Sequence, residues 1–138
     1  IELFFQAFEQ HSNSGDISAH VSQFADAFLA AGPQGAQPVR AVDFAVALPK
    51  RKQLFDSLGC RSTSLVSIEP VALDGRYTLV RTRWRMVFDQ AQEAPKEVLA
   101  DSTFIVNSSG SGLKIVFYLA HRDIMAILKE RGIMAGTA

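Results

Sequence analysis

The stretch that decides the fold is Tyr77–Phe88, YTLVRTRWRMVF. Because successive side chains of a strand point to opposite faces, its even positions share one face and its odd positions share the other. The even face carries Trp84, the only tryptophan of the chain, and the odd face carries Arg81, Arg83 and Arg85. A helix would spread those arginines around its circumference. The segment therefore predicts a long strand with one apolar and one charged face.

Length and composition indicate one folded domain. The chain has 138 residues, of which 48% are hydrophobic and 20% charged, and it is long enough to bury a core. Its 14 basic residues balance 14 acidic ones, whereas generic nucleic-acid binding depends on a basic excess. The single cysteine, Cys60, excludes an internal disulfide and suits a reducing compartment, and no apolar run reaches the roughly 18–20 residues of a membrane span. We therefore expect one cytoplasmic domain over residues 1–138, with no nucleic-acid or membrane partner.

The first third of the chain predicts two helices. Apolar residues at helical spacing over residues 3–8 indicate the first. The second follows Asp16, whose carboxylate can accept hydrogen bonds from the first backbone N–H groups of a helix. Its apolar face recurs every three or four positions, at Ile17, Val21, Phe24 and Phe28. Gly32 and Pro33 would end it, since Gly adopts the left-handed C-cap conformation and Pro cannot continue a helix.

The middle of the chain carries a basic run. The expected elements there are a loop over residues 32–38, a short strand over residues 39–44 and a short helix over residues 49–58. Lys50, Arg51 and Lys52 crowd the first turn of that helix, where the helix dipole disfavours cations. Either these three side chains are solvated, or they form a basic lip that meets an anion or an acidic partner.

From Thr63 onward the pattern is one of strands joined by turns. A strand over residues 63–73 leads through Asp74-Gly75, a dipeptide favoured in tight hairpins, into the central strand. Strands over residues 97–107 and 113–121 follow, and Asp123 caps a final short helix.

Hairpin pairing assigns the side chains to two faces of one sheet. Symmetric closure of the turns places Trp84 opposite Ser102, Arg85 opposite Asp101, and Phe104 near Phe117. The apolar face is expected to pack against the helices. A slip of one residue in the pairing would exchange the two faces of a strand.

Helices followed by a meander of long strands resemble the nuclear transport factor 2-like (SnoaL-like) superfamily. The segments that carry the resemblance are GDISAHVSQFADAFLAAGP, RKQLFDSLG, RYTLVRTRWRMVF, DSTFIVN and GLKIVFYLAH. The resemblance implies an α+β fold, a cone-shaped roll of N-terminal helices packed against a strongly curved antiparallel sheet, with a short C-terminal helix. It also implies a pocket inside the cone, and the residues expected to line it are Trp84, Met86, Phe88, Ser102, Phe104, Phe117 and Tyr77. Members include isomerases, dehydratases, epoxide hydrolases, cyclases and binding proteins, so the fold does not decide the function.

Enzymes of this superfamily commonly use an acid–base pair inside the cone, and the candidates here are His121 and Asp43. His121 is expected on the inner face at the end of the last strand, and Asp43 lies in the short strand over residues 39–44. The alternative is that His121 is a hydrogen-bonded strand-end residue and Asp43 a surface group. The sequence has no metal-ligand spacing and no phosphate-binding loop, so we expect no metal and no cofactor.

Three functions remain open. The chain is a domain that binds a small, largely apolar ligand in the cone, or a small isomerase, dehydratase or hydrolase in which His121 acts as acid or base. The third is a protein-interaction module that uses the outer face of the sheet.

The sequence also predicts a homodimer through the outer face of the sheet. Three arginines in one row repel one another, and Asp101 neutralises only one of them, so acceptors from a second chain are expected. The expected interface residues are Arg81, Arg83, Arg85, Asp101, Ile105, Val116 and Tyr118.

Overall fold

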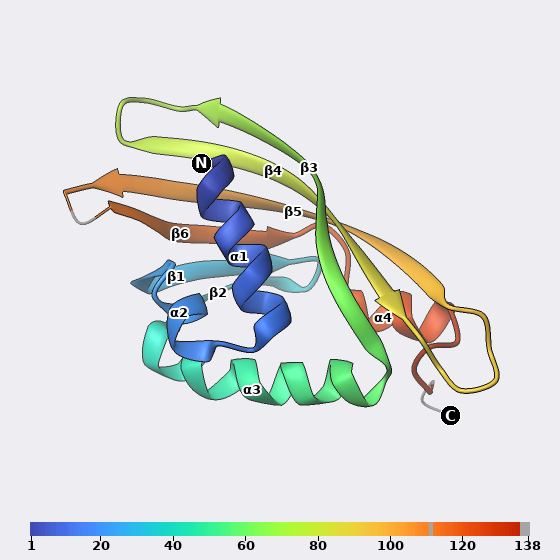
Figure 1. Cartoon of the computed structure of the whole chain (residues 1–138). Coiled ribbons are helices and arrows are strands. Elements are labelled where there is room, and N and C mark those ends of the chain that lie inside the picture. The colour runs from blue at the N-terminus through green and yellow to red at the C-terminus, as the bar shows by residue number, and fades with distance from the viewer. Residues whose placement is uncertain (111, 136–138) are drawn as a thin grey trace.

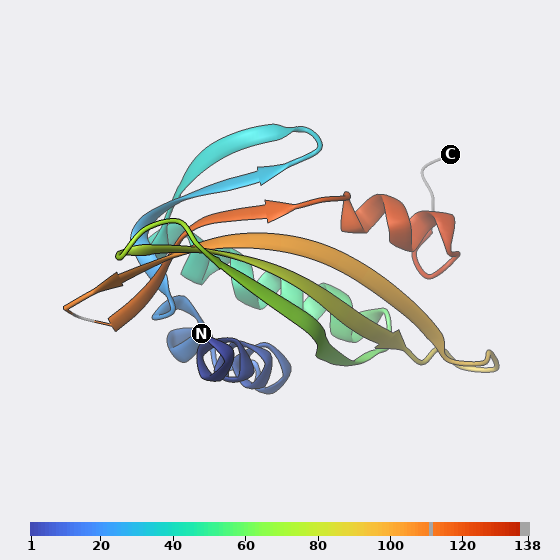
Figure 2. The ribbon, with the colours of Figure 1, turned by 90° about the horizontal axis from the view of Figure 1, so that it is seen from above.

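The computed structural model describes residues 1–110 and 112–135, which form helices on one face of a curved sheet (Figure 1). In chain order the elements are α1 (Glu2–Ser14), α2 (Ile17–Val21), β1 (Phe24–Gly32), β2 (Gly35–Arg40), α3 (Ala41–Ser57), β3 (Cys60–Ala72), β4 (Tyr77–Phe88), β5 (Lys96–Ser109), β6 (Gly112–Ala120) and α4 (Ile124–Glu130). α1, α2 and α3 lie against one face of the sheet, and α4 lies beyond the end of β6 (Figure 2).

The sheet has six strands in the order β2-β1-β6-β5-β4-β3. All neighbouring pairs are antiparallel except β1 and β6, which run parallel. The predicted α+β class and roll architecture are confirmed, and the parallel pair is an addition that the sequence pattern did not predict. No helix within the described ranges combines the length and the apolarity needed to cross a membrane.

The second helix is much shorter than predicted. α2 ends at Val21, and the chain continues as β1 from Phe24. Phe24 and Phe28 are nevertheless buried, as the helical pattern required. Two residues four positions apart share a face in a strand as well as in a helix, so this spacing could not distinguish the two. The predicted loop over residues 32–38 is the turn between β1 and β2 together with most of β2.

The third helix is longer than predicted. α3 begins at Ala41, so the expected short strand over residues 39–44 is divided between β2 and this helix. Pro49, the expected helix start, lies inside α3. Lys50–Lys52 consequently lie in the second half of α3 and not in its first turn. The chain leaves α3 through Gly59, with φ of 87°, where an added Cβ would overlap the backbone of Asp89 at the end of β4. Only glycine fits this close approach without strain.

The pairing of β4 with β5 differs from the prediction by two residues. Arg83, not Arg85, faces Asp101, and Trp84 faces Ala100. A shift of two residues leaves every side chain on its expected face. Trp84 and Phe104 are buried on the inner face, as predicted.

The pairing of β5 with β6 contains a bulge that changes the faces. Near the turn the predicted register is right, with Val106 opposite Ile115, but beyond the bulge Phe104 faces Tyr118 and Ile105 faces Phe117. The bulge moves every later residue of β6 by one position. The expected inner location of Phe117 is therefore wrong, and so is the expected outer location of Tyr118, whose ring packs 5.1 Å from that of Phe104.

Two groups of buried side chains hold the helices to the sheet. The first lies under α1 and centres on Phe5, Trp84 and Phe104, whereas the second lies under α4. The members of the second group are Phe55, Met86, Phe88, Val98, Ile127, Leu128 and Ile133. α4 therefore closes one end of the roll, and the space between the two groups is left to the pocket described next.

Candidate functional site

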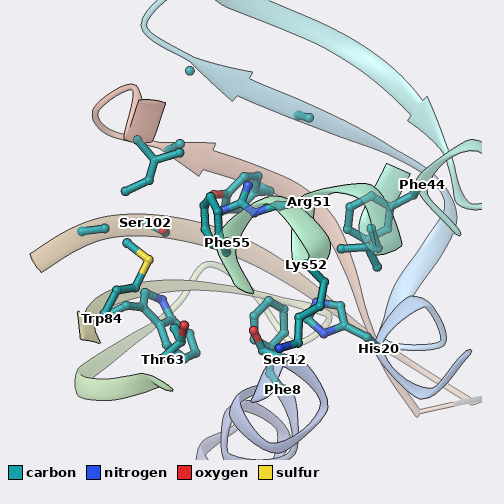
Figure 3. Close-up of a pocket in the computed structure, with 18 of the residues that line it drawn as sticks. Phe8, Ser12, His20, Phe44, Arg51, Lys52, Phe55, Thr63, Trp84 and Ser102 are labelled. Atoms are coloured by element: carbon teal, nitrogen blue, oxygen red, sulfur yellow. The ribbon is translucent and has the colours of Figure 1, made fainter. Parts of the chain in front are cut away.

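A pocket of about 720 Å³ lies between the helices and the inner face of the sheet (Figure 3). Its volume falls in the range of roughly 300–1,000 Å³ that is usual for small-molecule sites. The wall includes eight aromatic rings, contributed by α1, β1, α3, β4, β5 and β6. These rings belong to Phe8, Phe24, Phe28, Phe44, Phe55, Trp84, Phe104 and Tyr118.

Four of the seven residues expected at the pocket lie on its wall: Trp84, Met86, Ser102 and Phe104. The other three do not. Phe88 is buried beneath α4, Phe117 is on the outer face, and Tyr77 stands at the start of β4 away from the pocket. The indole of Trp84 donates to Thr82 Oγ1 over 2.8 Å, and this hydroxyl donates to the Ser102 carbonyl over 2.9 Å. The Trp84 indole and the Thr82 hydroxyl are thereby satisfied within the sheet.

The structure does not bring His121 and Asp43 together. His121 is exposed on the outer face, where its Nε2 lies 2.7 Å from Thr103 Oγ1, and Asp43 is exposed on α3. Neither residue lines the pocket. The expected inner location of His121 is wrong because the bulge in β6 reverses its face. The geometry matches the alternative, a hydrogen-bonded strand-end histidine and a surface carboxylate.

His11 and His20 both line the pocket, and His20 is the buried one. The residue is 7% exposed, and its ring lies beside that of Phe8 (Figure 3). The centroid of the His20 ring is 4.5 Å from that of Phe8 and 5.9 Å from that of Phe24. Burial, helped by the charges of His11 and Arg51, lowers the pKa of His20 from 6.5 to about 4, so the ring is neutral near pH 7. In the part of the chain that the structure describes, neither ring nitrogen has a hydrogen-bond partner. The imidazole can therefore offer one donor and one acceptor to an occupant.

The sequence did contain a signal for His20. It lies three residues after Ile17 and four before Phe24, on the apolar face of the predicted second helix. A polar ring on an apolar stripe indicates either a satisfied core histidine or a site residue. Asp16 fixes the turn that carries it, because its carboxylate accepts a hydrogen bond from the Ala19 backbone over 3.1 Å.

Most of the charged groups around the pocket are neutralised by partners. Lys52 pairs with Asp56 at 2.7 Å and Arg61 with Asp89 at 3.4 Å. Arg51 is different. Its guanidinium lies 4.9 Å from the centre of the Phe55 ring, and no carboxylate within residues 1–110 and 112–135 is within salt-bridge distance of it.

The remaining reactive groups are unfavourable for nucleophilic or metal chemistry. Burial raises the pKa of the Cys60 thiol, which disfavours the thiolate that a nucleophile requires. Among the described residues, no three His, Cys, Asp or Glu side chains converge to hold a metal ion.

On the outer face each arginine of β4 has an acidic partner in the same chain. Arg83 pairs bidentately with Asp101, with a shortest distance of 2.8 Å, and Arg85 pairs with Glu97 at 2.9 Å. Arg81 lies 3.9 Å from Glu69. The hydrogen bond from Arg83 also lowers the pKa of Asp101. The expectation that two arginines would lack acceptors is therefore wrong.

An apolar row crosses the outer face beside these ion pairs. It consists of cross-strand neighbours on β3, β4, β5, β6 and β1, all pointing away from the helices: Val71, Leu79, Ile105, Phe117 and Leu29. Val71 and Leu29 are each 40% exposed. Ile105 is therefore on the surface for which it was predicted. Tyr118 is replaced there by Phe117, and Val116 lies half-buried at the bulge.

Solved structures with the same fold were found, although no protein-family model and no curated protein matches the sequence. An NTF2-like protein with a cystatin-like fold from Novosphingobium aromaticivorans superposes with a TM-score of 0.73 at 11% identity, over 96% of this chain and 85% of that one. An NTF-2-like protein of unknown function from Shewanella oneidensis MR-1 superposes with a TM-score of 0.68 at 16% identity, over 86% of this chain and 93% of that one. A ketosteroid isomerase-like protein from Erwinia carotovora atroseptica superposes with a TM-score of 0.66 at 18% identity, over 88% of this chain and 92% of that one. The chain thus has the cystatin-like α+β fold of nuclear transport factor 2-like proteins.

Proposed function

We propose that this protein binds a small, largely apolar molecule in the pocket inside the roll. The observation that carries the proposal is a pocket of about 720 Å³ whose wall includes eight aromatic rings. Sites for small molecules are concave and mostly apolar, with a small number of polar groups that fix orientation. His20 and Arg51 supply such groups at this pocket, while the hydroxyl of Thr82 and the indole of Trp84 are already hydrogen-bonded.

Filling the pocket should abolish binding of a neutral apolar probe. Ala100 is half-buried on β5, faces Trp84 and lines the pocket. The substitution Ala100→Phe places a ring in the space that a ligand would occupy. We expect the affinity for N-phenyl-1-naphthylamine, measured by its fluorescence increase, to fall at least about tenfold.

The matched control is Leu99→Phe, which adds a ring at the adjacent position on the outer face, where Leu99 is 47% exposed. This variant should bind the probe as the wild type does. Equal binding by Ala100→Phe and wild type, or no binding by wild type, would contradict the pocket proposal.

The enzymatic alternative has less support at this pocket. General acid–base catalysis works best with a group whose pKa is near the operating pH. His121 lies on the other face of the sheet, and the pKa of about 4 makes His20 a weak base. A binding function requires only the donor and acceptor that neutral His20 offers.

We also propose that a second copy of this chain covers the outer face of the sheet. The apolar row Val71, Leu79, Ile105, Phe117 and Leu29 supports the proposal, because a monomer would leave this row in contact with water. The neighbouring arginines and carboxylates alternate in sign, so a two-fold arrangement could bring opposite charges together at the rim.

Introducing a charge into the apolar row should weaken dimerisation. With Phe117→Asp, we expect light scattering at micromolar concentration to give the monomer mass, since an unpaired carboxylate would be desolvated in the interface. Leu73→Asp is the control, because Leu73 is 53% exposed in the turn after β3, outside the row. A monomeric wild type, or a dimer unchanged by Phe117→Asp, would refute this proposal.

A further inference from the structure

We propose that the apolar ligand of this pocket carries an anionic head group, such as a carboxylate or sulfonate, and that Arg51 binds it. The inference rests on the pocket function proposed above and specifies the chemical class of the ligand. An exposed arginine that lines an aromatic pocket lies where the pocket meets solvent. A ligand of this class would insert its apolar part among the rings and leave its charge beside Arg51.

The first support is the charge balance of the pocket wall. Its Lys and Arg residues are Arg51, Lys52, Arg61 and Arg122. Three of the four have carboxylate partners, since Arg122 pairs with Glu130 at 3.3 Å in addition to the pairs of Lys52 and Arg61. Arg51 has no such partner in the described ranges. An anion that enters the pocket would therefore find one uncompensated cation, which is the condition for a net electrostatic gain on binding.

The wall offers no carboxylate that is poised to neutralise Arg51 instead. Its acidic residues are Asp56, Asp101 and Asp123. Asp56 pairs with Lys52 and Asp101 with Arg83. Asp123 accepts hydrogen bonds from the Met125 backbone and from the Gln34 side chain.

The second support is the way in which Arg51 is held. Its guanidinium lies over the ring of Phe55, one turn further along α3 (Figure 3). This cation–π contact uses none of the N–H groups, and none of them donates a hydrogen bond within residues 1–110 and 112–135, so they are free to bind an anion. A planar fork of donors held against a ring is suited to two parallel hydrogen bonds with a carboxylate or sulfonate.

The third support is the neutrality of the deeper polar group. His20 is uncharged near pH 7 and borders the same pocket. It can hydrogen-bond a carbonyl or hydroxyl group of the ligand, but it does not compete with Arg51 for the negative charge. Within the described ranges, Arg51 is thus the Lys or Arg side chain of the wall without a carboxylate partner, and His20 is a neutral donor and acceptor among the rings.

Two probes that differ by a single anionic group test the inference. 8-Anilinonaphthalene-1-sulfonate carries a sulfonate that N-phenyl-1-naphthylamine lacks, and both fluoresce in apolar pockets. We expect Arg51→Gln to weaken binding of the sulfonate about tenfold and to change binding of the neutral probe by less than about twofold. Arg51→Lys should retain part of the affinity for the sulfonate, because it keeps the charge and loses the planar fork.

The matched control is Lys50→Gln, which removes the same charge from the preceding, exposed position of α3, outside the pocket wall. It should leave both probes unaffected. The inference is overturned if Arg51→Gln leaves the sulfonate affinity unchanged, or if Lys50→Gln lowers it equally, which would indicate a diffuse effect of surface charge. Failure of the neutral probe to bind the wild type would contradict the pocket function itself, and the two failures are therefore distinguishable.

Discussion

Replacing Phe104 by Ala is expected to lower the free energy of unfolding by about 3–5 kcal/mol. Phe104 is 1% exposed and lies at the centre of the roll, with its ring 5.0 Å from Phe5, 5.5 Å from Phe8 and 5.1 Å from Tyr118. Removing it leaves a cavity between α1 and the sheet that these rings cannot close without losing their contacts with one another. Urea denaturation monitored by circular dichroism measures the change.

Leu99→Ala is the control for this experiment, because Leu99 lies on the same strand but is 47% exposed on the outer face. This variant should lose less than about 1 kcal/mol of the free energy of unfolding, as is usual for surface substitutions. If Phe104→Ala lost no more than Leu99→Ala, the packing of α1 against the inner face would be wrong.

The central strand could be predicted because its two faces differ so strongly. Alternation of apolar residues with Arg81, Arg83 and Arg85 fits only a strand with one covered face. An error of two residues in its pairing with β5 left the faces intact, so Trp84 and Phe104 were placed correctly.

The last strand could not be predicted to the same level. Its residues are apolar at nearly every position from Ile115 to Ala120, so alternation does not assign a face. The bulge opposite Ile105 and Val106 then exchanged Phe117 with Tyr118 and moved His121 outward. A bulge depends on the fit between neighbouring strands, and a single sequence does not reveal it.

The part of the site contributed by α2, β1 and α3 was missed for two other reasons. Pro49 suggested the start of a helix, yet α3 runs through it. Arg51 therefore lies in the second half of α3, where it lines the pocket, and not in a first turn as expected. The spacing of Phe24 and Phe28 suggested a helix, yet β1 begins at Phe24. His20 lies near the end of α2, just before β1 begins, and its ring packs against that of Phe8.

Lowering the pH from about 7 to about 4.5 is expected to remove roughly 2–3 kcal/mol of the free energy of unfolding through His20. The pKa of its imidazole is 6.5 in the unfolded chain and about 4 in the folded protein. Between these values the unfolded state binds a proton and the native state does not, so protonation favours unfolding. The contribution is therefore fully present above pH 6.5 and is lost as the pH falls toward 4.

The variant His20→Phe isolates this effect, because phenylalanine fills the site between Phe8 and Phe24 with a ring that cannot be protonated. Urea denaturation at both pH values should show a smaller loss for this variant than for the wild type, by roughly 2–3 kcal/mol. Asp101 does not obscure the result. Its lowered pKa makes its contribution disappear only as the pH falls below 3.8, outside the measured window. The control is His121→Gln, which alters an exposed histidine on the outer face. Between the two pH values, its free energy of unfolding should fall by as much as that of the wild type. An identical loss in wild type and His20→Phe would show that His20 is not held neutral among the rings of the pocket.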